Sequence, residues 1–77
     1  MSEDRELSFG ERAVGLTFNP SGDAVVADLK KSASYFIDNC HLLRETATDP
    51  EIKRMYSVAI TEAQTAQMWA VKAATWR

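Results

Sequence analysis

A chain of 77 residues forms a single domain and buries only about 60% of the surface that it exposes when unfolded. The net charge of −2 and the pI of about 5.2 argue against a partner made of long nucleic acid, and no apolar run approaches the roughly 18 residues of a membrane span. One cysteine, Cys40, forms no disulfide within the chain, and with the one histidine beside it supplies too few ligands for zinc. We expect no metal and no cofactor, so association between copies is the remaining way to stabilise so small a core.

The first 20 residues carry the turn and charge signals of an arm. Residues 1–8 are expected to be disordered. Within residues 9–20, Val14, Leu16 and Phe18 alternate with smaller residues, and this period of two predicts a short extended stretch with one buried face. An extended stretch is not stable alone, so we expect this arm, extended or as a short helix, to lie on the helices that follow.

A first long helix is predicted over residues 21–45, with Ser21 as its N-cap and Asp23 in its first turn. Its apolar residues recur in steps of three and four, which is typical of one buried helix face. These residues are Val26, Leu29, Ala33, Phe36, Cys40 and Leu43, with Val25 and Ile37 widening the face. Cys40 is expected to be buried as a small hydrophobic side chain. Lys30 and Lys31 lie off this face, and each taken singly is expected to be solvated.

A second long helix is predicted over residues 49–76, and two patterns place its start. Thr48 and Glu51 have the spacing of a capping box, or Asp49 caps and Pro50 occupies the first helical position. The inner face is almost entirely alanine after its first turns, which lets two helices approach closely. Because the connection is short, the sequence predicts an all-α fold, an antiparallel helical hairpin in residues 9–77.

The second helix is more apolar than a two-helix hairpin requires. A helix with apolar residues on every side is normally buried on every side. The excess residues are Tyr56, Ile60, Met68, Trp69 and Val71, and we expect them to form the interface of a homo-oligomer. The alternative is that the N-terminal arm covers them.

No catalytic residue is predicted, and we do not expect an enzyme. Cys40 and His41 are adjacent on one helix and point about 100° apart, so they cannot form a nucleophile and base pair. No glycine-rich phosphate loop follows a strand.

Two groups of side chains are suited to binding. Near the C-terminus, Lys72 lies within a turn of Trp69, Thr75 and Trp76, and a cation, a hydroxyl and indoles could receive a phosphate and stack a base. The alternative for Lys72 is a favourable interaction with the negative end of the helix dipole. A second group combines a lysine of the first long helix with residues of the arm, namely Lys30 with Arg12, Phe18 and Asn19.

Three stretches carry a resemblance to a known family: residues 9–15 (FGERAVG), 18–21 (FNPS) and 66–75 (AQMWAVKAAT). They resemble the small bacteriophage helical-hairpin proteins shared by anti-CBASS and Thoeris anti-defence sponges. The resemblance implies an oligomer, typically a hexamer, that holds a cyclic nucleotide immune signal intact in the cytoplasm of the infected bacterial host. The implied ligands are cyclic dinucleotides, cyclic trinucleotides or cyclic ADP-ribose variants.

The same resemblance implies two ligand sites. Lys30 is similar to a phosphate-contacting lysine of the first long helix. Phe9 and Phe18 are the aromatic rings available to stack on a base, with Arg12 and Asn19 beside them. Lys72, Thr75 and Trp76 correspond to a separate trinucleotide pocket, where lysine in place of arginine lacks the bidentate fork.

We expect the smaller ligands to lie between copies, because ligand pockets enclose about 300 to 1,000 Å³ and a hairpin has no such interior. Three alternatives to a cyclic oligonucleotide sponge stay open. One is a sponge for a cyclic ADP-ribose signal. Another is a structural or adaptor protein that binds a partner helix and no small molecule. The third is a nuclease that degrades the signal.

Overall fold

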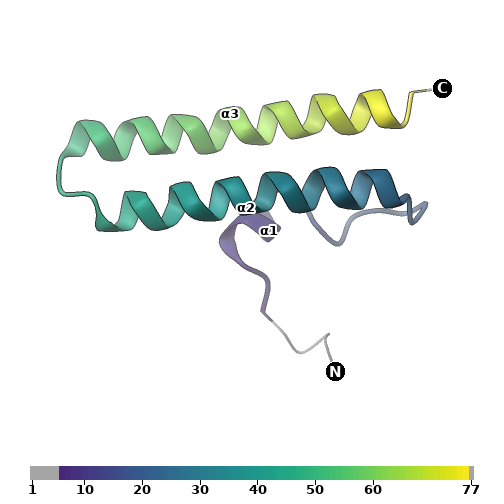
Figure 1. Cartoon of the computed structure of the whole chain (residues 1–77), viewed down its shortest axis with the longest axis horizontal. Helices are drawn as coiled ribbons and strands as arrows, with labels where there is room; N and C mark the ends of the chain where they lie inside the picture. Colours follow the sequence, from purple (N-terminus) through teal and green to yellow (C-terminus); the bar gives the residue numbers. More distant parts are fainter. Residues whose placement is uncertain (1–5, 77) are drawn as a thin grey trace.

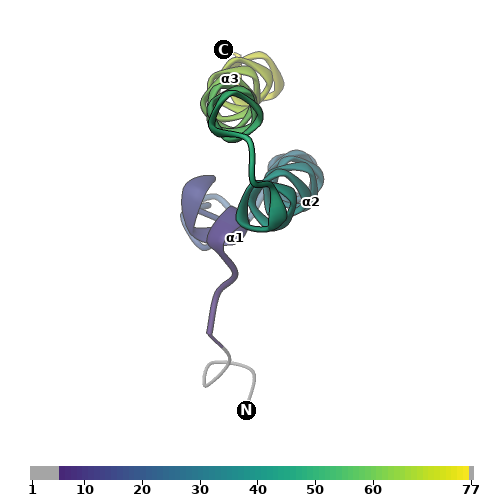
Figure 2. The ribbon, with the colours of Figure 1, turned by 90° about the vertical axis from the view of Figure 1, so that its left-hand side faces the viewer.

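The computed structural model describes residues 6–76. This part of the chain contains three α-helices, joined by turns and irregular segments, and no strand. The helices are α1 (Phe9–Ala13), α2 (Ala24–Thr46) and α3 (Pro50–Ala74). α2 and α3 run antiparallel along their whole length, and α1 packs against α2 (Figure 1). Seen along the hairpin, α1 lies beside α2 (Figure 2). The predicted helical hairpin is therefore confirmed.

Helix α2 begins three residues later than predicted. The side chain of Asp23 accepts hydrogen bonds from the backbone N–H groups of Val25 and Val26, at 2.8 and 3.3 Å, so Asp23 and not Ser21 is the N-cap. Gly22 has a φ of 64°, a left-handed conformation that a continuous right-handed helix cannot contain. The helix therefore cannot start at residue 21.

Helix α3 begins where both sequence patterns placed it, and the structure distinguishes them. Asp49 accepts a hydrogen bond from the Glu51 N–H at 2.9 Å, and Pro50 occupies the first turn, where its missing N–H costs nothing. Of the two predicted caps, Asp49 is therefore confirmed, and the capping box that begins at Thr48 is not found. The helix ends at Ala74 rather than at residue 76.

The N-terminal segment (residues 6–23) is a short helix followed by turns, so the extended stretch predicted from the alternation in residues 14–18 is wrong. Ser8 and Glu11 form a capping box in which the Glu11 N–H donates to Ser8 Oγ at 3.1 Å and the Ser8 N–H donates to Glu11 Oε1 at 2.8 Å. These bonds fix helical geometry from Phe9 onward. Ser8 thus contradicts its predicted disorder, while residues 1–5 of that predicted segment lie outside the described residues.

Helix α1 is held on α2 by a carboxylate and by a close backbone approach. Asp38 accepts hydrogen bonds from Ser8 Oγ and from the Gly10 N–H, both at 2.7 Å. A β-carbon at Gly10 would overlap the backbone carbonyl oxygen of Ser34, so only glycine permits this approach. The N-terminal segment is therefore placed by specific contacts.

The core is small and its face on α2 differs from the predicted one. Val14, Ile37, Cys40 and Ile60 form the buried cluster, with Ile37 fully buried. The prediction for Cys40 is confirmed. The predicted burial of Phe36 and Leu43 is wrong, since they are 53% and 47% exposed.

The face of α2 that is buried instead includes two polar residues, Lys30 and Ser34, under the N-terminal segment. The short α1 covers this side because Gly10, which has no β-carbon, lets its backbone come close to the backbone of Ser34. Among residues 6–76, no helix is long and apolar enough to cross a membrane.

Candidate functional site

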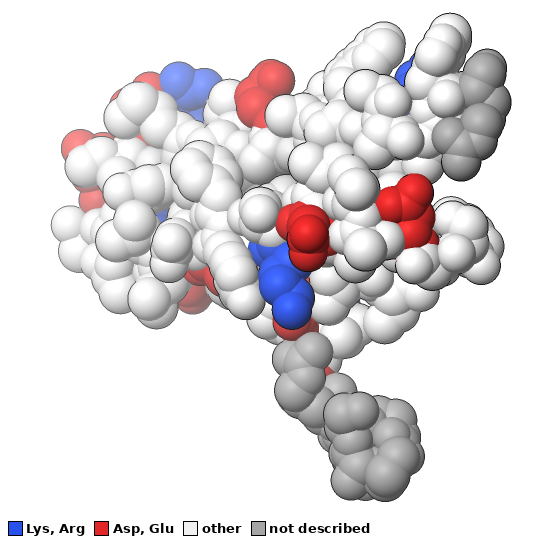
Figure 3. All heavy atoms as spheres, turned by 45° about the vertical axis from the view of Figure 1, so that its right-hand side comes forward, with Lys and Arg blue, Asp and Glu red and all other residues white. Residues whose placement is uncertain are grey.

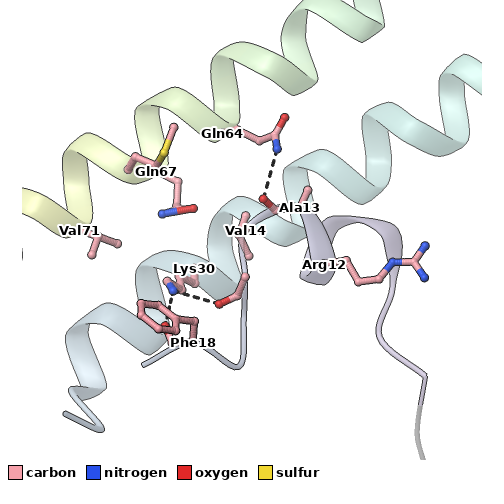
Figure 4. A pocket seen from close by; sticks show the side chains of 10 residues that line it. Arg12, Ala13, Val14, Phe18, Lys30, Gln64, Gln67 and Val71 are labelled. Carbon is pink, nitrogen blue, oxygen red and sulfur yellow. Dashed lines mark hydrogen bonds between the residues drawn. The ribbon is translucent and has the colours of Figure 1, made fainter. Parts of the chain in front are cut away.

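A groove of about 520 Å³ lies between the N-terminal segment and the two long helices (Figure 4). We call it the N-terminal groove. Its side chains come from all three parts of the fold, and they include Arg12, Phe18, Lys30, Gln64, Gln67, Met68 and Val71. The volume falls in the range of ligand pockets, about 300 to 1,000 Å³. The N-terminal segment adds a wall that two helices alone lack, but the groove is open at the surface, so the expectation that the smaller ligands lie between copies stays a prediction.

Lys30 is the cation of this groove, and it is buried rather than solvated as predicted. It is 6% exposed, and its Nζ donates to the backbone carbonyl oxygens of Gly15, at 3.0 Å, and Phe18. Both acceptors are neutral. Among the described residues no carboxylate forms an ion pair with Lys30, so its positive charge is not neutralised within residues 6–76. An anion placed in the groove would interact with it favourably in a partly desolvated setting.

Phe18 presents an aromatic face next to this cation. The ring is 73% exposed, and the Lys30 Nζ lies 5.5 Å from its centroid. A turn positions the residue: Gly15 has a φ of 63°, and its carbonyl accepts the Phe18 N–H at 2.9 Å. An exposed aromatic ring offers a face on which a planar ligand can stack.

The other residues predicted for this site lie differently. Arg12 borders the groove, but its guanidinium points away from Lys30 (Figure 4). Asn19 uses its amide locally, donating to the Asp23 carbonyl at 2.9 Å and accepting the Asp23 N–H at 3.2 Å. Phe9 does not line the groove, because its ring stacks on His41 with centroids 4.2 Å apart. The structure thus brings together Lys30 and Phe18, with Arg12 at the edge.

Sequence reasoning missed two glutamines of α3 that line the groove. Gln64 donates from Nε2 to the Ala13 carbonyl oxygen at 3.2 Å and so joins α3 to the end of α1 (Figure 4). Gln67, one turn further on, is 8% exposed. The signal was available, since Ile60, Gln64 and Gln67 follow steps of four and three along one helix face.

A second, shallower cavity of about 400 Å³ lies at the C-terminal end of α3. Lys72 lies between two indoles, with its Nζ 5.6 Å from the Trp69 ring and 5.9 Å from the Trp76 ring. The Thr75 hydroxyl donates to the Val71 carbonyl oxygen at 2.8 Å, so it is used within the helix. Of the predicted trinucleotide group, Lys72 and Trp76 therefore share a cavity, and Thr75 does not line it.

The apolar excess of α3 is exposed at this end. Met68, Trp69 and Trp76 are 59%, 66% and 71% exposed, so the described N-terminal segment does not cover them. Figure 3 shows the C-terminal end of α3 as largely uncharged surface. Two other residues of the predicted interface lie inward: Tyr56 packs on the core, and Ile60, 5% exposed, has almost no surface left for a second copy.

The remaining reactive groups are used for packing. His41 Nδ1 lies 2.9 Å from Arg44 Nη2, whose guanidinium also donates to Ser57 Oγ at 3.0 Å. Cys40, which precedes His41 in the sequence, is buried in the core. Within residues 6–76, no three His, Cys, Asp or Glu side chains are grouped to hold a metal ion.

The fold is a helical hairpin whose N-terminal groove combines a buried cation, Lys30, with the exposed ring of Phe18. The family model described as "Acb2/Tad1, hairpin domain" matches residues 11–75, and this chain belongs to that family. It is the family of anti-CBASS and anti-Thoeris sponges, which bind their ligands and are not enzymes. No curated protein and no solved structure is significantly similar to the chain.

Proposed function

We propose that this protein is a bacteriophage immune-evasion protein that sequesters cyclic oligonucleotide signals of the infected host, in its cytoplasm, without cleaving them. The observation that carries the proposal is the pairing of Lys30, buried and without a carboxylate partner among the described residues, with the exposed ring of Phe18 on one groove. Membership of a sponge family supports the same function.

The groove's chemistry fits a cyclic dinucleotide. Such a ligand carries two negative charges and two flat bases. Lys30 offers an ammonium to a phosphate, and Phe18 offers a face to a base. To compete with a host receptor, a sponge needs nanomolar binding, which corresponds to about −12 kcal/mol. A cyclic ADP-ribose variant has the same two kinds of group, a phosphate and an adenine, and is the alternative ligand.

Association between copies completes this proposal. The N-terminal groove is open, and the exposed Met68 and Trp69 lie on the same end of α3 as its last lining residue, Val71. A second copy placed on this apolar surface would bury it and close the groove. We expect a homo-oligomer, with a hexamer as the form that the family resemblance implies.

The C-terminal cavity is the candidate site for a cyclic trinucleotide. Lys72 between Trp69 and Trp76 places one cation among aromatic faces. Contributions from several copies would be required to neutralise three phosphates, because one chain supplies one lysine there. This site depends on the oligomer more strongly than the N-terminal groove does.

Calorimetric titration with a panel of cyclic dinucleotides, cyclic trinucleotides and cyclic ADP-ribose variants tests the function. The Lys30→Met variant keeps the aliphatic stem and removes the charge, and we expect it to weaken dinucleotide binding by about 1.5 to 3 kcal/mol. Lys31→Met is the matched control, since Lys31 is exposed and outside the groove. Circular dichroism verifies that both variants remain helical. Equal affinities for Lys30→Met and the unmodified protein would refute the assignment.

The fate of the ligand separates the remaining alternatives. A ligand at 100 times its Kd should stabilise the protein by about 2.7 kcal/mol, whereas an adaptor protein without a small-molecule site would melt unchanged. After heating the complex, a sponge releases intact ligand. Release of a degraded ligand would instead show that the protein is a nuclease.

A further inference from the structure

Gln67 is a buried polar residue of the N-terminal groove whose amide has no partner in the described chain. Its side chain is 8% exposed, and no hydrogen bond joins its amide to another residue within 6–76. Every fully buried side-chain nitrogen or oxygen in that range does have a hydrogen-bond partner. The amide of Gln67 is therefore in contact with the open space of the groove, while its stem is packed.

The position of this amide is opposite the cation. Figure 4 shows the Gln67 amide directed into the groove, toward Lys30 and away from the solvent side of α3. Phe18 and Lys30 form the other wall. A planar ring stacked on Phe18 would turn one of its edges toward α3, where Gln67 is the glutamine with an unused amide.

A carboxamide supplies one donor and one acceptor side by side. Adenine presents the complementary pair, an N6 amino donor beside the N7 acceptor, and glutamine binds this edge through two hydrogen bonds. Guanine presents two acceptors, O6 and N7, on the same edge, so one of them would face the amide oxygen. The amide therefore distinguishes the two purines on this edge.

The edge of guanine that carries N1 and N2 also finds few hydrogen-bond partners in the groove. Its N1 and N2 donors require acceptors, and none of the described residues that line the groove is acidic. The carbonyl oxygens of Gly15 and Phe18 already accept from Lys30, and that of Ala13 accepts from Gln64. On this edge the Gln67 amide can pair with N1 and O6 but leaves the N2 amino group without an acceptor, and a buried donor without an acceptor costs free energy, so guanine is disfavoured there relative to adenine.

We propose that Gln67 is the residue that reads the base in this groove and that it selects adenine. The proposal rests on the proposed function and narrows its ligand class to cyclic nucleotides that contain adenine. Lys30, the cation that could otherwise bind the two acceptors of guanine, is held by backbone carbonyls and is assigned to a phosphate.

Titration calorimetry with cyclic di-AMP and cyclic di-GMP tests the proposal through the ratio of their two Kd values. We expect the unmodified protein to bind cyclic di-AMP about 5- to 150-fold more tightly, the range of one bidentate base contact. Gln67→Met has a similar size without the amide and should bring the ratio close to one. Gln67→Glu is isosteric, and its carboxylate accepts from guanine N1 and N2, so the preference should reverse.

Gln64→Met is the control, because the same residue type one turn away already donates to Ala13. It should keep the ratio while lowering stability. A ratio unchanged in Gln67→Met, a preference for cyclic di-GMP in the unmodified protein, or an equal loss for both ligands in Gln67→Glu would each overturn the proposal. Those results require that some ligand binds. Absence of binding to any cyclic nucleotide would instead refute the proposed function itself.

Discussion

Removing the carboxylate of Asp38 should detach α1 from the hairpin. Asp38 accepts from Ser8 Oγ and from the Gly10 N–H, both at 2.7 Å, and these bonds cross 30 and 28 residues of sequence. In Asp38→Ala both donors lose their partner at once. Val14, a core residue that follows α1, would then be less firmly covered, and the wall of the N-terminal groove would move.

The size of this effect can be worked from the two contacts. A hydrogen bond to a charged group contributes about 1.5 to 3 kcal/mol, so the pair contributes at most about 3 to 6 kcal/mol. Both hydrogen bonds are only partly buried, and water replaces part of the loss, so we expect about 3 kcal/mol. A chain of 77 residues has a total stability of about 4 to 12 kcal/mol, so the loss is a large fraction of it.

Urea unfolding followed by circular dichroism, at one fixed protein concentration, measures the change. Asp38→Asn keeps one acceptor oxygen and should lose about half as much. Asp28→Ala is the control, because Asp28 is exposed on the same helix and should change stability by no more than about 0.5 kcal/mol. If Asp38→Ala and Asp28→Ala unfold at the same urea concentration, the carboxylate does not hold α1 and the reasoning is wrong.

Three further predictions concern the core, the surface and the assembly. Ile37→Ala should cost about 2 to 5 kcal/mol in the same urea assay, because Ile37 is fully buried, whereas Val25→Ala, at a position 56% exposed, should cost little; similar losses would contradict the described core. The pKa of Glu51 is lowered from 4.5 because the Arg54 guanidinium donates to both of its carboxylate oxygens, so the pair's contribution is present above pH 4.5 and is lost as the pH falls through the lowered pKa. Arg54→Ala should therefore raise the pKa of Glu51 back toward 4.5 in an NMR titration, and an unchanged titration would refute the ion pair. Replacing Trp69 and Trp76 together by serine should shift sedimentation velocity profiles toward a smaller particle, and profiles identical to those of the unmodified protein would rule out this end of α3 as the interface.

The helices were predictable from the sequence because local signals define them. The Asp49 and Pro50 pair fixes the start of α3, and the short connection makes the two long helices antiparallel neighbours. The start of α2 was predicted wrongly, and of the two forms expected for the N-terminal segment, extended or a short helix, the extended one is wrong. In both places a few side-chain-to-backbone bonds, from Asp23 and from Ser8 with Glu11, outweighed a pattern read over more residues.

The site was harder to predict because it depends on contacts distant in sequence. Lys30 and Phe18 were both selected from the sequence, but the burial of Lys30 could not be, since lysine off an apolar face is normally solvated. Its burial follows from the turn at Gly15, which brings two carbonyl oxygens over α2. Gln67 was missed for the same reason. Its role depends on a wall formed by residues about 50 positions earlier in the chain.

The one cysteine of the chain has a consequence for experiment. Cys40 is buried in the core cluster with Val14, Ile37 and Ile60, and it is the only thiol in the sequence. A thiol reagent can reach it only when the hairpin opens, so the rate of labelling reports how often the native structure opens locally or globally. Labelling of this one thiol therefore measures how a bound ligand changes the frequency of opening, and no additional cysteine has to be introduced.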